Sequence, residues 1–398
     1  ITAVGIPLLG VMSIGISRSE GLLDLSGRVS HRFRVLFTCA LYLTIGPLFA
    51  IPRCAATSFT IGLLPFAGNQ VWLWQLLFSV FFFAAVLYVS LKPSKILDSV
   101  GKFLNPAFLA FLGVMLVAAL VRPVNSLSEV PVSGGYEGGA FFAGFLQGYD
   151  TLDALASLAF GIIVIRTIRQ LGVTEPGAVA GSTVKAGVVS MALMALIYAA
   201  TALVGAQSYG LYAAELSTPG FTGGDAFAMI SHHYFGRGGS LILAATVTLC
   251  CMKTAIGLVT ACSETFLELF PGKLDYPKWA VVFTGASLLI SNIGLSQIIA
   301  LSAPVLYFLC PLAIVLILLG IFGNLFGHAR IVYGCAMGTS LAAAVLELAR
   351  VVGGACQPLV DWTAGWLPLY SYGLGWVVPA AVGFGVGLLL NARGNKCQ

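Results

Sequence analysis

Two aspartates interrupt an apolar stretch of about 28 residues near the middle of the chain. Asp150 and Asp153 lie in the segment FLQGYDTLDALAS, together with Gly148, Tyr149 and Thr151. A glycine followed by polar residues inside an apolar run predicts a broken helix, which presents free N–H groups at one end and free carbonyl groups at the other. Such a site suits both charges of a zwitterion, for example an amino acid. The alternative is an aspartate that only caps the helix starting at Thr151.

A lysine lies near the centre of another apolar stretch. Lys253 and its neighbour Thr254 belong to LILAATVTLCCMKTAIGLVTACSETF, in which Thr260 and Glu264 continue the same helical face. An ammonium inside a membrane span is costly and is therefore a functional candidate, because it can titrate or pair with a carboxylate. The alternative is a lysine that extends its ammonium to the headgroups, for which the span centre is the least favourable position.

An arginine follows a proline in the early segment GPLFAIPRCAATSF. This apolar stretch of about 32 residues is too long for one straight crossing, and Pro47 and Pro52 are predicted to kink it. Arg53 is then placed toward the outer side, as a candidate gate residue that pairs with a carboxylate; anchoring at the interface is the alternative. A later segment, SNIGLSQ, predicts a tight extracellular turn between two spans, and an element of the transport pathway is the alternative.

The sequence contains no motif of a metal centre or a nucleotide-binding loop. Its nine cysteines show no metal-ligand or disulfide spacing, and His232 and His233 have no cysteine or histidine partners at metal spacing. No phosphate loop, HExxH motif or paired serine and histidine occurs. We therefore expect no catalytic residue, metal or cofactor. An intramembrane enzyme would need a nucleophile with a base, or a metal set.

Composition places these residues in a membrane. The 398 residues are 59% hydrophobic and 9% charged, with a mean hydropathy of +0.97, which leaves too few polar groups to coat a soluble protein. Each helical crossing needs about 20 apolar residues. The predicted fold class is therefore an all-α membrane protein. About eleven spans are expected, at 1–17, 35–66, 71–91, 103–121, 141–168, 186–206, 241–267, 280–293, 298–322, 331–348 and 374–390.

Positive charges are concentrated in alternate loops. Fifteen of the 20 Lys and Arg lie in one set: Arg18, Arg28, Arg32, Arg34, Lys92, Lys95, Lys102, Arg166, Arg169, Lys185, Lys273, Lys278, Arg330, Arg393 and Lys396. The opposite loops hold Arg122, Arg237 and Arg350. The first set is therefore predicted to be cytoplasmic, as is the C-terminus. Topology accounts for the net charge of +5, so we expect the lipid bilayer as a partner and no nucleic acid.

The visible chain would then begin on the outer side. It starts at Ile1, without an initiator methionine or a signal peptide. One further span upstream would place both termini in the cytoplasm, so the sequence predicts that a first helix is missing. A native protein of eleven spans, or a processed end, remains the alternative.

Six segments occur in an order typical of one transporter family: GPLFAIPRCAATSF, KILDSVGKFLNP, GFLQGYDTLDALASLAFGIIVI, GVTE, KTAIGL and SNIGLSQ. With them the sequence resembles the bacterial BrnQ-type branched-chain amino acid:cation symporters (LIVCS family, APC superfamily) over nearly its whole length. The resemblance implies a LeuT-like fold with two inverted five-helix repeats. It divides a single transmembrane domain, 1–398, into helices 2–5 of the first repeat (1–121), helices 6–10 of the second (141–322) and helices 11–12 (331–390).

The resemblance also implies roles for the polar residues. The helix-six segment would bind substrate through Gly148, Tyr149, Asp150, Thr151 and Asp153. Lys253 and Thr254 align with the hydroxyl pair of helix eight that helps to hold sodium in sodium-coupled relatives. Our hypothesis is that the Lys253 ammonium takes the place of the cation, which makes transport proton-coupled or sodium-independent.

The predicted function is secondary active symport of leucine, isoleucine and valine into the cell, across the bacterial inner (plasma) membrane, driven by a proton or sodium gradient. The alternatives are a passive facilitator or channel, and an inactive truncated carrier. Discrimination among the three substrates should be weak, since one methylene in an apolar pocket contributes only about 1–3 kcal/mol. The oligomeric state is not predicted.

Overall fold

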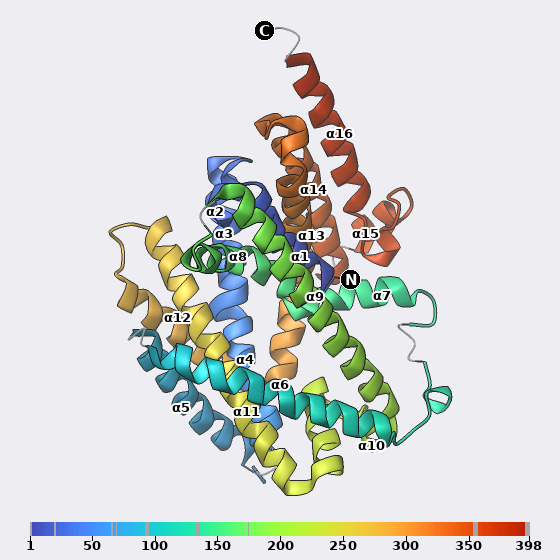
Figure 1. Cartoon of the computed structure of the whole chain (residues 1–398). Helices are drawn as coiled ribbons and strands as arrows, with labels where there is room; N and C mark the ends of the chain where they lie inside the picture. The colour runs from blue at the N-terminus through green and yellow to red at the C-terminus, as the bar shows by residue number, and fades with distance from the viewer. Residues whose placement is uncertain are drawn as a thin grey trace. The chain divides into compact units, whose positions relative to one another are not determined.

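The protein is helical throughout the described part of the chain (Figure 1). The computed structural model describes residues 2–19, 21–64, 67–68, 70–91, 95–132, 136–173, 175–352 and 357–394, and no strand occurs within those ranges. Lys92 and Lys396 of the predicted charge map lie outside them. The main helices are α1 (Gly5–Ile16), α2 (Leu22–Gly27), α3 (His31–Leu43), α4 (Ala50–Gly62), α5 (Val71–Leu91), α6 (Lys95–Val121), α7 (Ala140–Gln147), α8 (Asp153–Gln170), α9 (Pro176–Gln207), α10 (Tyr209–Tyr212), α11 (Gly223–Leu269), α12 (Tyr276–Ser291), α13 (Leu295–Phe322), α14 (Arg330–Val352), α15 (Gln357–Ala364) and α16 (Val377–Gly394). Short helical turns are η1 (Thr44–Leu48), η3 (Leu127–Glu129), η4 (Gly148–Thr151), η5 (Gly323–Phe326) and η7 (Tyr370–Tyr372).

Six segments of the described chain are long and apolar enough to cross a membrane, and a seventh is the bent pair α7–α8. The six are His31–Gly62, Val71–Leu91, Gly177–Gln207, Gly223–Leu269, Leu295–Phe326 and Arg330–Val352. The other predicted spans fall on α1, α6, α12 and α16, and the shorter apolar part of α6 is Pro106–Val121. An all-helical fold with six or seven candidate membrane spans is therefore confirmed for the described chain, whereas eleven crossings, the inverted repeats and a preceding helix stay predictions.

The chain divides into two compact units. Unit 1 consists of Ile1–Tyr42, Ser133–Ala195 and Leu301–Gln398, and unit 2 of Leu43–Val132 and Leu196–Ala300. Unit 1 contains α1, α2, α7, α8 and α14 to α16. Unit 2 contains α4 to α6 and α10 to α12.

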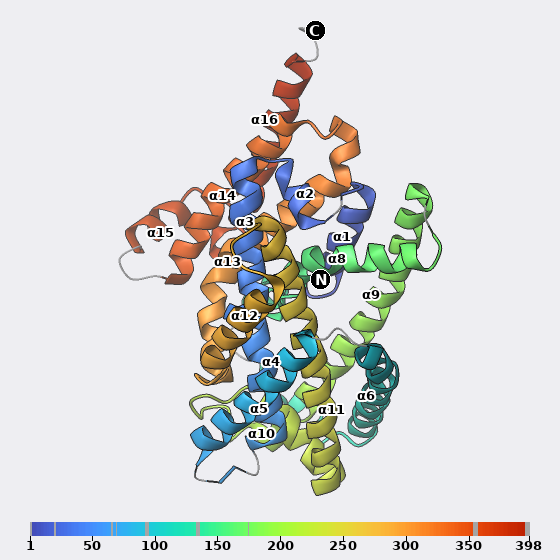
Figure 2. The same ribbon diagram turned by 90° about the vertical axis from the view of Figure 1, so that its left-hand side faces the viewer.

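Small residues bring the helices of unit 1 close together. A Cβ on Gly161 of α8 would lie 2.7 Å from Cδ1 of Ile14 in α1. On α16, Gly383 and Gly387 have the four-residue spacing that lets membrane helices approach closely, and a Cβ on Gly387 would lie 2.8 Å from Cα of Val332 in α14. Both views show α14 and α16 side by side (Figures 1 and 2).

In unit 2, α4 packs along α11 and both contact α12 (Figure 2). The predicted kink before α4 is confirmed at Pro47, which lies in the π-type turn η1 after the non-helical Gly46. A proline in a helix interior removes a backbone hydrogen bond and forces such a break. Pro52, by contrast, lies in the first turn of α4, where proline is tolerated.

Two further features of unit 2 concern loops and bends. The predicted tight turn is confirmed, because α12 ends at Ser291 and α13 begins at Leu295, with Gly294 at φ 97°. A second bend was not predicted: within α11 the backbone leaves helical geometry at Gly236, with φ 58° and ψ −154°. Because glycine lacks a Cβ, it adopts this conformation without steric cost.

In unit 1, a histidine is fixed between the ends of α13 and α14. The Arg28 guanidinium donates to Nδ1 of His328, and Nε2 of His328 lies 3.0 Å from Oδ1 of Asn324. Since arginine can only donate, Nδ1 accepts and Nε2 carries the proton of a neutral ring. Burial, and then the charge of Arg28, lower the pKa of His328 below its usual value.

We expect the thermal stability of the purified protein to fall as the pH decreases from about 7.5 to 5.5. Below about pH 6.5 the unfolded chain gains a proton at His328 that the folded protein binds less readily, so the contribution present at higher pH is lost. Differential scanning fluorimetry in detergent measures this. In His328→Gln the decline should be smaller, whereas exposed His31→Gln is the control; equal profiles for all three proteins would contradict the assignment.

Candidate functional site

The predicted break of the helix around Gly148 is present in unit 1. α7 ends at Gln147, the chain passes through the 3₁₀ turn η4, and α8 begins at Asp153. Leu152 between them is left-handed, with φ 64°, and the two helices are bent by 47°. The Thr151 hydroxyl donates to the carbonyl of Gly148 at 2.9 Å and lies 3.4 Å from the backbone nitrogen of Asp153.

The start of the described chain lies directly against this break. Thr2 donates its hydroxyl to the carbonyl of Phe145, 2.8 Å away, which would otherwise be a free acceptor at the end of α7. A Cβ on Gly148 would lie 2.6 Å from Cβ of Thr2 and 3.0 Å from the nitrogen of Ala3. Only glycine therefore fits at this position, because its missing side chain is the space that Thr2 occupies.

Tyr149 points its ring into an aromatic cluster. The side chain is 1% exposed and its ring centroid lies 5.9 Å from that of Phe145 and 5.7 Å from that of Tyr307 in α13. The Tyr149 hydroxyl and the indole nitrogen of Trp376 are both buried and lie near each other, but neither forms a hydrogen bond of good geometry within the described structure. Buried polar groups normally have partners, so these two atoms retain hydrogen-bonding capacity beside the break.

The two aspartates are half-buried at the break. Asp153 is the first residue of α8, where a carboxylate is favoured by the helix dipole, but Leu152 occupies the N-cap position, and the first N–H group of α8 donates to the Thr151 hydroxyl. The alternative, in which an aspartate is only the N-cap of this helix, is therefore wrong, because the N-cap residue is Leu152. Asp150 is close enough to Tyr307 and Cys310 for its charge to act on both side chains.

Sequence reasoning missed an ion pair beside the break. On α14, Glu347 accepts a hydrogen bond of 2.9 Å from Nε of Arg350, and its other oxygen accepts one of 2.8 Å from the Gly375 nitrogen. The Glu347 side chain is 1% exposed. Arg350 also lies 5.5 Å from the ring centroid of Tyr307, which contacts Tyr149. The signal was available, since Glu347 is an ionisable residue inside a predicted span.

The other predicted residues lie in unit 2. Lys253 is half-buried and Thr254 is exposed on α11, where the Thr254 hydroxyl donates to the carbonyl of Cys250. No carboxylate lies within ion-pair distance of Lys253 among the described residues. Arg53 is half-buried on α4, and its neighbour Cys54 contacts Cys251 of α11. Arg53 and Lys253 therefore lie on neighbouring helices, at similar positions along the helix axes.

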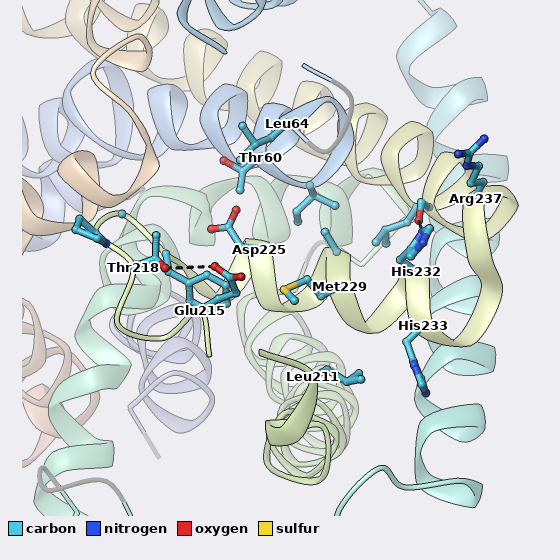
Figure 3. Close-up of a pocket in the computed structure, with 17 residues that line it drawn as sticks. Thr60, Leu64, Leu211, Glu215, Thr218, Asp225, Met229, His232, His233 and Arg237 are labelled. Carbon is cyan, nitrogen blue, oxygen red and sulfur yellow. Dashed lines mark hydrogen bonds between the residues drawn. The ribbon is translucent and has the colours of Figure 1, made fainter. Parts of the chain in front are cut away.

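A large pocket occurs at one end of unit 2 (Figure 3). Its volume is about 1080 Å³, and α4, α10 and α11 contribute to its wall together with the loop 213–222. Figure 3 shows Glu215 and Asp225 toward one side, His232 and Arg237 toward the other and Met229 between them. Thr60 of α4 lines it, about two helical turns beyond Arg53.

No group of three or more metal-ligating side chains occurs within the part of the chain that the structure describes. What the geometry provides is a broken helix with buried aromatic, carboxylate and glycine groups, and a separate pair of cations. Groups of these kinds can bind a small polar solute.

Comparison with known proteins agrees with this. Residues 1–393 match a family model described as "Branched-chain amino acid transport protein". The chain is 47% identical to the branched-chain amino acid permease BrnQ of Lactobacillus delbrueckii subsp. lactis, in a match covering 97% of this chain and 86% of that protein. It is 39% identical to the permease BraB of Bacillus subtilis (98% and 86% covered) and 36% identical to BrnQ of Escherichia coli (96% and 84% covered).

Proposed function

Because the chain belongs to the branched-chain amino acid transport protein family, a family of transporters and not of enzymes, we propose that it is a secondary symporter for leucine, isoleucine and valine. The observation that carries the proposal is the break between α7 and α8. It lies in an otherwise apolar helix pair and brings backbone polar groups, Tyr149 and two aspartates to one place.

In the proposed arrangement the zwitterionic end of the substrate lies at this break. The N-terminal end of α8 attracts the carboxylate, and carbonyl groups at the end of α7, together with Asp150, attract the ammonium. Gly148, Thr151 and Asp153 shape the backbone there, and the buried Tyr149 hydroxyl is a further polar partner. A LeuT-like arrangement of inverted repeats, with Arg53 as an outer gate, completes the proposal.

The test is uptake of radiolabelled leucine by the full-length protein in proteoliposomes, with proton and sodium gradients imposed separately. We expect leucine to accumulate above its external concentration under one gradient, and isoleucine and valine to compete, with alanine and lysine as weak competitors. Equilibration without accumulation under either gradient would contradict symport and favour a passive facilitator.

Lys253 is proposed to replace the coupling cation. We expect wild-type uptake to be independent of sodium at fixed membrane potential and pH. Lys253→Thr restores a pair of hydroxyl residues and is expected to lower sodium-free uptake about tenfold, which corresponds to about 1.4 kcal/mol, and to make the remainder respond to sodium. The measurement is the initial rate with sodium or choline outside.

The matched control is Lys273→Thr, which removes an exposed lysine after the end of α11. It should leave uptake unchanged. A wild-type protein that requires sodium at fixed potential and pH would rule out the coupling role of Lys253, while leaving leucine transport itself intact.

A further inference from the structure

A basic pocket of about 280 Å³ lies in unit 1, away from the broken helix. Its walls come from α2, α3, α14 and the segments that precede α3 and α14 (Figure 1). The lining residues are Leu23, Asp24, Gly27, Arg28, Arg34, His328 and Arg330. Among them three arginines face one carboxylate, so the pocket carries a net positive charge.

One of the three arginines is held rigidly by the protein. Arg28 donates to the carbonyl of Ser17 at 2.7 Å and to the hydroxyl of Ser19 at 3.1 Å, as well as to His328. All of these partners are uncharged, because Nδ1 of His328 is an acceptor. The Arg28 charge is therefore fixed in place at the pocket wall without being neutralised.

The other two arginines are available for a ligand. Neither Arg34 nor Arg330 forms an ion pair within the described ranges of the chain. Cδ of Arg34 lies 3.4 Å from the position that a Cβ on Gly27 would take, so the aliphatic part of the arginine packs against this glycine. Arg330 is the first residue of the 23-residue helix α14, whose N-terminal dipole end adds to the positive potential. Planar guanidinium groups in this number suit a phosphate group.

The two helices that carry Arg34 and Arg330 also expose apolar side chains. Leu36, two residues after Arg34, is 71% exposed, and Ile331, next to Arg330, is 44% exposed. Both belong to candidate membrane spans, where exposed apolar side chains face acyl chains. A ligand bound where these two candidate spans begin has a phosphate beside the arginines and hydrocarbon along the apolar part of the helices. A phospholipid has both parts.

We propose that this pocket binds the phosphate of an anionic phospholipid in the leaflet that the charge map places on the cytoplasmic side. Arg34 and Arg330 contact the phosphate, and Arg28 supplies a fixed charge behind them. Basic residues in alternate loops also set the orientation of a membrane protein. Orientation, however, requires neither a pocket nor an arginine that is hydrogen-bonded to two serines.

The test is the affinity of the full-length protein in detergent micelles for a fluorescent phosphatidylglycerol, measured by anisotropy. We expect saturable binding, little competition by phosphatidylcholine, and an approximately thirtyfold weaker affinity in Arg34→Gln/Arg330→Gln, since each arginine near an anionic surface contributes about a factor of five. Thermal unfolding in phosphatidylcholine micelles verifies that each variant is folded.

The matched control is Arg32→Gln/Arg169→Gln, which removes the same charge from exposed positions that do not line the pocket. Its affinity should stay within a factor of about two of the wild type, because diffuse surface charge is screened by salt. An equal loss of affinity in both double variants would overturn binding at the pocket and attribute the affinity to general surface charge. Displacement of the probe by inorganic phosphate as effectively as by phosphatidylglycerol would overturn the phospholipid as occupant.

Discussion

Replacing Gly148 by valine is expected to lower the initial rate of leucine uptake by about five- to 150-fold. A Cβ at this position would lie 2.6 Å from Cβ of Thr2 and 3.0 Å from the nitrogen of Ala3, and a valine adds two further methyl groups. Overpacking of this kind costs about 1–3 kcal/mol. If transport requires the contact between Thr2 and the break, this free energy corresponds to a decrease in rate of about five- to 150-fold. The backbone of Gly148 is right-handed, so the effect is steric and not conformational.

The control for this prediction is Gly144→Val. Gly144 lies four residues earlier, in α7, and a Cβ there would have no neighbour within 4 Å. Uptake should fall by less than about threefold, since an exposed helical glycine accepts a side chain at little cost. The two variants should be compared at equal amounts of folded protein, determined by gel filtration. Equal rates for both would remove Gly148 from the proposed substrate site.

Replacing Arg350 by alanine is expected to destabilise the protein by about 3–5 kcal/mol and to reduce the yield of folded protein. The variant leaves the Glu347 carboxylate buried with only the Gly375 N–H group as a partner. Breaking a buried ion pair at one end is costly because the remaining charge is desolvated and uncompensated. Thermal unfolding in detergent measures the loss.

Two further variants separate the ion pair from general damage to α14. Glu347→Gln/Arg350→Met removes both charges while glutamine still accepts from Gly375, so most of the stability should return. Lys278→Ala breaks another pair at the same three-residue spacing, with Asp275 at 3.2 Å, but both side chains are exposed. It should cost less than about 1 kcal/mol. A double variant as unstable as Arg350→Ala would contradict the explanation.

The two predictions concern connected parts of unit 1. Tyr307 contacts the Tyr149 ring on one side and the Arg350 guanidinium on the other. We expect Glu347→Gln/Arg350→Met to fold and yet to alter leucine uptake, because the group that packs against Tyr307 has changed. The ratio of uptake to folded protein is the relevant measurement.

The features that the sequence predicted correctly are local. Gly148 and the polar residues after it predicted a broken helix, Pro47 predicted a kink, and SNIGLSQ predicted a tight turn, because each depends on the conformational preferences of a few adjacent residues. The membrane-spanning class followed from composition, since apolar content sums over the whole chain irrespective of fold. The family followed from six ordered segments.

The features that the sequence missed depend on residues far apart in the chain. Thr2 meets the break at Phe145 and Gly148, Glu347 meets Gly375, and Arg28 meets His328. No local preference predicts such contacts, because they arise only when helix packing brings distant segments within hydrogen-bond distance. The sequence alone therefore determined a helical membrane carrier with a break at Gly148. Tertiary packing decided why that position must be glycine, and that the charge beside it is the pair of Glu347 and Arg350.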